Sequence, residues 1–309
     1  MVVVNPPRPY RTRGTKPNYL AQRTIGYGLP LALLTLFIGV PFVQAFIYSL
    51  TNWNGFSELN FIGIKNYLTL LFEDERFQES LAHAALLTVV FVVQSVGVAL
   101  LASYLIHHLR SARGKRVAMV LIMVPSVAPT VAMLLLWSNF LQPAGLVNQI
   151  LSAVGLDFLT ANWLGDPNTV LIALMLVGFP WLNGLNTLIF MSGFLSVDPS
   201  LYEAAGIEGA TRPKVFWYIE LPAIMPQIGL LSLIAVITAI QNYESIFLLT
   251  GGGPGSSSTV PGMELYNSAF RYSSFGYASA IGVIMFLVIA AIAFGATLAG
   301  RLVRSEKHA

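Results

Sequence analysis

Charged residues divide this sequence into long apolar stretches, and their spacing predicts a set of membrane-spanning helices. Seven stretches contain no Asp, Glu, Lys or Arg, and Glu244 alone separates the fifth of them from the sixth. A helix needs about 20 predominantly apolar residues to cross the hydrocarbon core of a bilayer. We therefore expect six transmembrane helices, at residues 25–50, 81–106, 117–140, 169–193, 223–250 and 276–299.

The composition excludes a soluble enzyme and favours an all-α polytopic membrane protein. Of the 309 residues, 55% are hydrophobic and only 10% are charged, whereas a soluble domain carries about 25% charged residues. The chain has no cysteine, no Gly-rich phosphate loop that ends in Lys and Ser or Thr, and no His-Glu-x-x-His sequence. We therefore expect no catalytic residue, no metal site and no cofactor in this chain.

The lysines and arginines set the expected orientation. All but three of the 17 lie in the two terminal segments, in the loop at 107–116 or in the loop at 194–222. Cytoplasmic loops retain Lys and Arg, so we expect both termini and both loops in the cytoplasm, with basic tails at 1–24 and 301–309. The first apolar run is too long for a signal peptide, and we expect it to stay uncleaved. Topology then accounts for the net charge of +3, which does not indicate nucleic acid binding.

The polar loop between the fourth and fifth spans is expected to form two short helices. Asp198 can cap free amides and Pro199 suits the first helical position, so a helix should start there. Gly206 and Gly209 should weaken and end that helix. A second short helix should follow, and Pro222 should prevent its simple continuation.

The same loop resembles the EAA loop of the permease subunits of binding-protein-dependent ABC importers. Glu203-Ala204-Ala205 is followed by Gly209 and then by Ile219-x-Leu221-Pro222. In that family the loop is cytoplasmic and its first helix docks into a groove on the ATPase subunit. The resemblance implies the type I importer permease fold and assigns ATPase coupling to Leu201, Tyr202, Glu203, Ala204, Ala205, Gly209 and Arg212. The alternative is an ordinary amphipathic connector between membrane helices.

Two further segments extend the resemblance to carbohydrate permeases. Residues 60–67 resemble the Phe-x-Gly-x-x-Asn-Tyr signature of sugar-type permeases, although a surface loop would have similar turn chemistry, and residues 249–280 resemble the corresponding part of the maltose-type permeases. The resemblance implies a permease in the cell membrane of a prokaryote that moves a di- or oligosaccharide. Its implied partners are a second permease, an ATPase dimer that binds ATP and Mg²⁺, an external substrate-binding protein and membrane lipid.

Polar residues within two spans are candidates for the substrate pathway. Amides and aromatic rings hold neutral sugars by hydrogen bonds and stacking, but amides in the fourth span could equally join helices to one another. A carboxylate at membrane depth is costly, so Glu244 should face a cavity unless it lies at the outer boundary. The pathway candidates are Trp181, Asn183, Asn186, Gln241, Asn242, Tyr243 and Glu244.

A different class of function, a secondary transporter driven by an ion gradient, is the alternative to the importer. It would require paired buried ionisable groups or broken helices in repeated halves, and the sequence offers one near-boundary glutamate and no visible duplication. His107 and His108 lie among cations at a membrane edge. There we expect a solvated face rather than a metal site.

Overall fold

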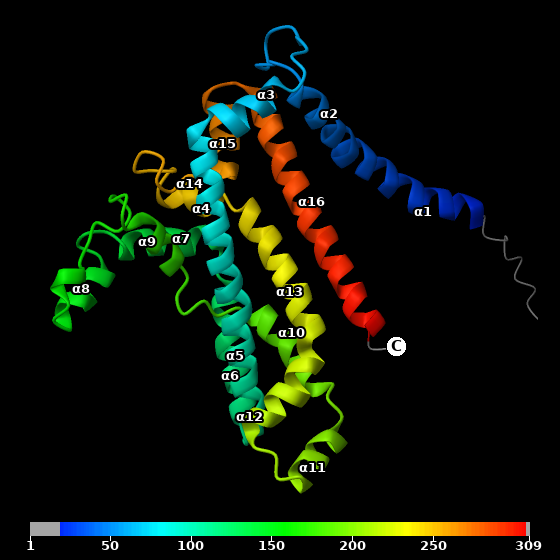
Figure 1. Ribbon diagram of the computed structural model, residues 1–309, viewed down its shortest axis with the longest axis vertical. Helices are drawn as coiled ribbons and strands as arrows, with labels where there is room; N and C mark the ends of the chain where they lie inside the picture. Colours follow the sequence, from blue (N-terminus) through cyan, green and yellow to red (C-terminus); the bar gives the residue numbers. More distant parts are fainter. Residues whose placement is uncertain (1–18, 307–309) are drawn as a thin grey trace, which may run out of the picture. The chain divides into compact units, whose positions relative to one another are not determined.

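The computed structural model describes residues 19–306, with side chains from 26 to 298, as two helical units (Figure 1). The first unit ends at Ile47 and the second begins at Tyr48. Within the described range, the one β pairing is an isolated bridge between Thr51 and Phe61, so the predicted all-α fold is confirmed. Helices extend into both predicted tails, from Tyr19 and up to Glu306; residues 1–18 and 307–309 lie outside the described residues.

The first unit is a helix with exposed apolar side chains. Its parts are α1 (Tyr19–Leu34), the π-helical turn η1 (Thr35–Gly39) and α2 (Val40–Ser49). The stretch Gly26–Ser49 is long and apolar enough to span a membrane. Side chains such as Leu31 and Phe37 are exposed there, as expected for a helix that meets lipid or another membrane protein.

Three long helical elements and one short helix form the core of the second unit (Figure 1). The long elements are α4 (Glu75–Val92) with η3 (Val93–Val98) and α5 (Ala99–His107); α12 (Arg212–Val215) with η6 (Phe216–Glu220) and α13 (Leu221–Gln241); and α16 (Phe275–Glu306). The short helix α10 (Gly184–Leu195) packs against α5 and α13, and Phe190, Phe194 and Ile224 are buried between them. Because lipid is as apolar as these side chains, close van der Waals packing is what stabilises such contacts.

Three of the predicted spans are broken. The third consists of α6 (Ala112–Met123), η4 (Val124–Val127) and α7 (Thr130–Phe140), with a bend of 89° before α7; the fourth of α9 (Val170–Leu176) and α10; the fifth of α13 and α14 (Glu244–Leu249). Pro125 and Pro129 lie at the 89° bend, where they cannot donate helical hydrogen bonds. Four unbroken helices of the described residues could span a membrane, and the bent pair gives a fifth. One of the four is Arg212–Gln241, which covers most of the predicted fifth span before its break. The count of six spans stays a prediction.

The expectation that Pro222 interrupts the second helix of the 194–222 loop is wrong. That helix runs without a break from Arg212 to Gln241. The π-helical turn η6 ends two residues before Pro222. A proline ring clashes with the carbonyl four residues earlier, and the wider turn relieves this crowding. The same arrangement precedes Pro41, where η1 is the widened turn.

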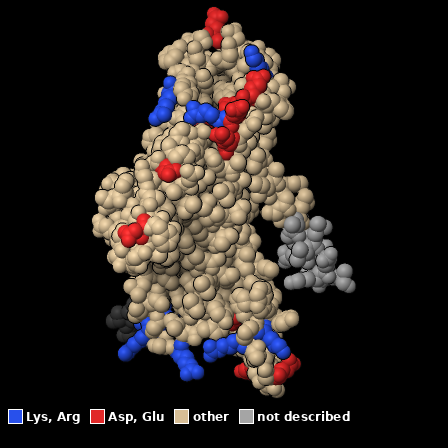
Figure 2. All heavy atoms as spheres, turned by 60° about the vertical axis from the view of Figure 1, so that its left-hand side comes forward, with Lys and Arg blue, Asp and Glu red and all other residues tan. Residues whose placement is uncertain are grey.

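Charged residues gather towards the two ends of the second unit. At one end lie α3 (Lys65–Leu68), η2 (Thr69–Glu73), α15 (Pro261–Tyr266) and η7 (Asn267–Arg271), and at the other lies α11 (Pro199–Ile207) (Figure 1). Between α7 and α9, the chain forms α8 (Leu146–Ala153) and η5 (Asp157–Leu159). Figure 2 shows a broad surface with few charges between the two charged ends. This distribution is the one expected of a protein that crosses a bilayer.

The signature at residues 60–67 joins two parts of the α3 end. Asn66 is 8% exposed, and its amide donates to the carbonyls of Ser49 and Thr51, both at 2.9 Å. The Tyr67 hydroxyl donates to Ser49 Oγ at 2.6 Å. Gly63 supplies the turn before α3 with a φ of 62°, a conformation that favours glycine.

Replacing Asn66 with alanine is expected to destabilise the protein by about 2–4 kcal/mol, because it removes a buried amide that donates to two carbonyls. The matched control is Asn60→Ala, since the Asn60 side chain is exposed. Thermal unfolding of the detergent-solubilised protein measures both. Equal unfolding temperatures for the two variants would show that the Asn66 amide does not stabilise this end.

Candidate functional site

The first helix of the 194–222 loop is α11, and both of its ends are capped as predicted. The carboxylate of Asp198 accepts a hydrogen bond from Ser200 N at 2.9 Å, and this bond lowers the pKa of Asp198. Pro199 occupies the first helical position. Gly209 follows the helix with a φ of 67°, and three amides after α11 bond back to carbonyls near its C-terminal end. The segment is therefore a well-defined helix that ends in a sharp turn.

One side of α11 is open to solvent and the other faces the protein. Glu203 and Ala204 are exposed, as are the apolar side chains of Leu201, at 49%, and Ile207, at 89%. Gly209 and Arg212 are exposed beyond the helix, and no atom lies within 4 Å of the position that a Gly209 Cβ would take. Exposed aliphatic side chains on a short polar helix are typical of a docking surface.

Tyr202 and Ala205, two of the predicted coupling residues, lie on the protein-facing side. Ala205 is 8% exposed, so it packs within this chain. The Tyr202 hydroxyl donates to Glu220 Oε1 at 3.2 Å. Burial and the neighbouring Glu220 carboxylate raise the pKa of Tyr202 to about 12. Tyr202 thus stays a neutral donor under all physiological conditions.

His107 and His108 are half-buried, so the expected solvated face is present only in part. His108 Nε2 lies 3.4 Å from Glu220 Oε1, and Glu220 has no exposed surface. The ring of His107 stacks on Phe194 at 5.3 Å and lies 6.5 Å from the ring of Tyr202. The sequence places these histidines about 100 residues before α11, and the packing of α5 against α10 brings them to it.

The pathway candidates of the fourth span lie at the break between α9 and α10. Asn183 caps α10, because its Oδ1 accepts from the Asn186 amide at 3.0 Å. The Asn186 side chain donates to Ser95 Oγ at 3.0 Å and so joins α10 to η3. Trp181, at a φ of 54°, donates from its indole to the Val177 carbonyl at 3.1 Å. All three side chains therefore have structural partners within the chain.

The pathway candidates of the fifth span lie at the break between α13 and α14. Asn242 is extended there, and its Oδ1 accepts from the Ser245 amide at 3.3 Å. Tyr243 stacks on Tyr266 with ring centroids 6.0 Å apart. Gln241, Tyr243 and Glu244 are exposed. These residues lie on an open surface of this chain rather than inside it.

A small cavity lies beside this break. Its volume is about 160 Å³, and Asn242, Ser245 and Gln94 provide polar atoms among apolar neighbours. Sites that enclose small ligands usually measure about 300–1,000 Å³. The cavity is therefore too small for a disaccharide. Of the seven pathway candidates, Asn242 alone lines it.

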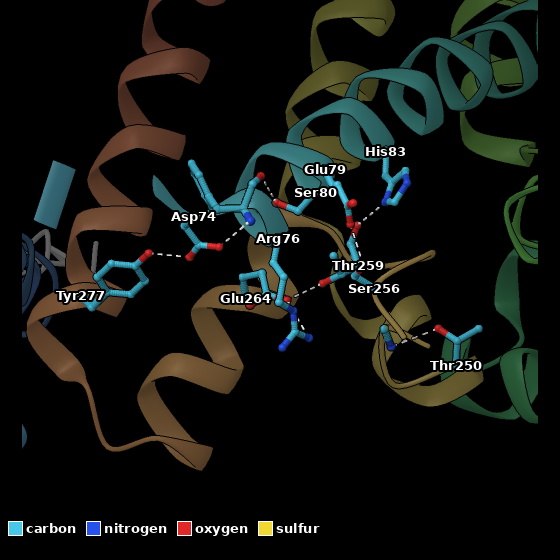
Figure 3. Close-up of polar contacts among 12 residues, drawn as sticks. Asp74, Arg76, Glu79, Ser80, His83, Thr250, Ser256, Thr259, Glu264 and Tyr277 are labelled. Atoms are coloured by element: carbon cyan, nitrogen blue, oxygen red, sulfur yellow. Dashed lines mark hydrogen bonds and ion pairs between the residues drawn. The ribbon is translucent and has the colours of Figure 1, made fainter. Parts of the chain in front are cut away.

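A polar cluster at the α3 end, the Glu264 network, ties the loop before α15 to α4 (Figure 3). Glu264 is 7% exposed; its Oε1 accepts from Thr259 Oγ1 at 2.8 Å and lies 3.6 Å from the Arg76 guanidinium. Further contacts join His83 to the Thr259 carbonyl, Ser256 to Glu79, and Tyr277 to Asp74. The network holds α4, α15 and α16 together at this end.

Comparison with known proteins assigns the chain to a family. The family model described as "Binding-protein-dependent transport system inner membrane component" matches residues 98–304, which include α10, α11 and the breaks in the fourth and fifth spans. The chain belongs to this family. It is a multi-pass membrane permease of the ABC transporter class, and its family is a membrane component rather than an enzyme.

Relatives of this permease carry names that refer to sugar uptake. It is 31% identical over 265 residues to the multiple sugar-binding transport system permease protein MsmF of Streptococcus mutans, covering 84% of this chain and 89% of that protein. It is 34% identical over 281 residues to the diacetylchitobiose uptake system permease protein NgcF of Streptomyces coelicolor, covering 86% and 79%. The trehalose/maltose transport system permease protein MalF of Thermococcus litoralis is 29% identical over 275 residues, covering 87% and 90%.

A solved structure shares the fold of this permease. In the crystal structure of a bacterial alginate ABC transporter in complex with an alginate pentasaccharide-bound periplasmic protein, one chain aligns with a TM-score of 0.78 and 23% identity, covering 92% of this chain and 95% of that chain. The predicted ABC importer permease fold is confirmed.

Three features of this permease escaped the sequence analysis. The exposure of Ile207 has a weak sequence signal, an isoleucine next to Glu208 in a polar loop. Glu220 is one of the charged residues of the loop at 194–222, but its burial depends on a contact with His108 at the end of α5 that no local pattern predicts. The Glu264 network joins residues nearly 200 positions apart.

Proposed function

We propose that this permease moves a carbohydrate, a di- or oligosaccharide, across a prokaryotic cell membrane as one half of a translocation pathway. The names of MsmF, NgcF and MalF support the substrate class. Tyr243, Asn242, Glu244, Gln241, Trp181, Asn183 and Asn186 are the proposed pathway residues. Because aromatic faces stack on sugar rings and amides bond to hydroxyls, the open surface at Asn242 and Tyr243 fits such a substrate.

A second permease completes the pathway in this proposal. The cavity of about 160 Å³ in this chain is too small for a disaccharide, and Tyr243 and Glu244 are exposed beside it. A facing subunit would enclose this surface and remove its exposed carboxylate from lipid, where a charge is costly. An external binding protein delivers the sugar.

The observation that carries the proposal is α11, a capped helix that presents Leu201, Glu203 and Ile207 to solvent. Arg212 and Lys214 follow α11, and the loop at 107–116 carries four more cations. The retention of Lys and Arg on the cytoplasmic side supports a cytoplasmic location for this end. There α11 docks on one subunit of an ATPase dimer that binds ATP and Mg²⁺. ATP-driven closure of that dimer favours one arrangement of α11 over another, which couples hydrolysis to transport.

Transport in proteoliposomes tests the proposal. The native chain, purified with its partner permease and ATPase, is expected to take up radiolabelled maltose or another disaccharide only with ATP on the cytoplasmic side and with the binding protein on the other side. An ionophore that dissipates ion gradients should leave uptake unchanged. If uptake needs no ATPase and collapses with the ionophore, the protein is a gradient-driven transporter and the proposal is wrong.

A further inference from the structure

The protein-facing side of α11 rests on one buried carboxylate. Glu220 has no exposed surface. It is the last residue of η6, on the long helix that continues as α13. Its Oε1 accepts from Tyr202 of α11 and faces His108 at the end of α5. Three separate elements therefore meet at a single carboxylate oxygen.

The hydrogen bonds around His108 indicate its protonation. His108 Nδ1 lies 3.0 Å from the carbonyl oxygen of Tyr104, which can only accept, so Nδ1 carries a proton. Nε2 faces Glu220 Oε1 at 3.4 Å, and a favourable contact there needs a second proton. Because Oε1 already accepts from Tyr202, the arrangement favours that proton on Nε2. His108 is then an imidazolium ion paired with the Glu220 carboxylate.

Unsatisfied polar atoms lie beside this pair. Glu220 Oε2 and His107 Nδ1 are buried without a hydrogen-bond partner. The His107 ring separates Phe194 of α10 from Tyr202 of α11. Buried polar atoms without partners are costly. The packing between α11 and the core therefore leaves two polar atoms unsatisfied in this arrangement.

We propose that the His108–Glu220 ion pair, through Tyr202, positions α11 and transmits its movement to α5 and α13. The inference rests on the proposed function and deepens it, since it names the residues that connect the ATPase-docking helix to the membrane helices. His108 and Glu220 are positioning residues: they lie behind α11 and do not contact the ATPase or the sugar. The two residues should therefore act as a unit on mutation. Replacing one of them leaves the other as an unpaired buried charge, whereas replacing both leaves no buried charge.

A double-mutant cycle in the complete transporter tests the pair. His108→Gln leaves the buried carboxylate without its cation, and we expect stimulation of ATP hydrolysis by the sugar-loaded binding protein to fall about tenfold or more. Glu220→Gln is expected to lower it several-fold. The double variant should recover to within about threefold of the native chain, because no buried charge remains. Tyr202→Phe, which removes only a hydroxyl, should lower stimulation several-fold in a folded protein.

The charge at position 108 separates coupling from a merely structural role. His108→Lys keeps a cation opposite Glu220 and should retain the stimulation that His108→Gln loses. His83→Gln, a histidine of the Glu264 network, is the matched control and should keep the native stimulation.

The amount of ATPase that co-purifies distinguishes failure of the proposed function from failure of this inference alone. We expect all variants to retain the ATPase, since α11 keeps its exposed side. If the ATPase does not co-purify with the native chain, the proposed function itself fails. If the native transporter is coupled but the effects of His108→Gln and Glu220→Gln simply add, or His108→Lys behaves as His108→Gln does, this inference alone is wrong.

Discussion

Replacing Glu203 with arginine is expected to abolish stimulation of ATP hydrolysis while the permease stays folded. Glu203 is exposed in the middle of α11, so its replacement removes no contact within the chain. In the proposed complex it supplies the charged contact with the ATPase. Reversing a charge at such an interface costs about 2–5 kcal/mol, which weakens binding by about thirtyfold or more. Co-purified ATPase and stimulated hydrolysis measure the effect.

Glu208→Arg is the matched control for this charge reversal. Glu208 is exposed at the C-terminal end of α11, on another side of the helix from Glu203. A cation there interacts favourably with the helix dipole, so the helix itself should persist. If Glu208→Arg and Glu203→Arg reduce stimulation equally, general electrostatics rather than a specific contact explains the loss.

The turn after α11 offers an independent check of docking. Gly209→Ala strains the backbone by about 1–2 kcal/mol because the native φ is positive, but it meets no neighbouring atom. Gly209→Trp adds bulk to the same strain. We expect the tryptophan variant alone to lose the ATPase, because only bulk obstructs a close approach. Equal losses in both variants would point to strain in the turn instead.

The transmembrane pattern was largely predictable, because absence of charge over about 20 residues is a direct consequence of bilayer physics. The breaks were harder to predict. Pro222 gives the same local signal as Pro129, yet a π-helical turn accommodates the first while the chain bends at the second. Both outcomes remove the clash with a preceding carbonyl, and packing against neighbouring helices selects between them.

In the candidate site, local features were also predictable from the sequence, whereas contacts between distant residues were not. The caps of α11 follow from Asp198 and Gly209, whose effects are local. Which side of α11 is buried depends on contacts with residues far away in the sequence, such as Glu220. The EAA resemblance could not show this, and it assigned Tyr202 and Ala205 to coupling, although both face the chain's own core. Sequence separation conceals such contacts, because nothing in residues 198–209 specifies what α5 presents to them.

The connection between α11 and the membrane helices also depends on a close approach at Gly193. A Cβ at this position would lie 2.9 Å from Ile224 Cγ2 and 3.1 Å from Gln227 Nε2. Ile224 is fully buried beside Phe194, so neither it nor the α10 backbone has room to shift. Gly193→Leu is therefore expected to destabilise the permease by about 3 kcal/mol or more, through overpacking. Thermal unfolding in detergent and the yield of monodisperse protein measure this loss.

Two further variants decide whether crowding is the cause. Gly229→Leu on α13 is the matched control, since no atom lies within 4 Å of its Cβ position, and it should unfold like the native chain. Ile224→Ala opens space opposite Gly193, so adding it to Gly193→Leu should recover part of the lost stability even though it is destabilising alone. Additive losses in the double variant would rule out the α10–α13 contact as the cause. Because α10 leads into α11 and α13 follows Glu220, a recovered contact should also restore stimulated hydrolysis, which connects packing in the membrane to coupling outside it.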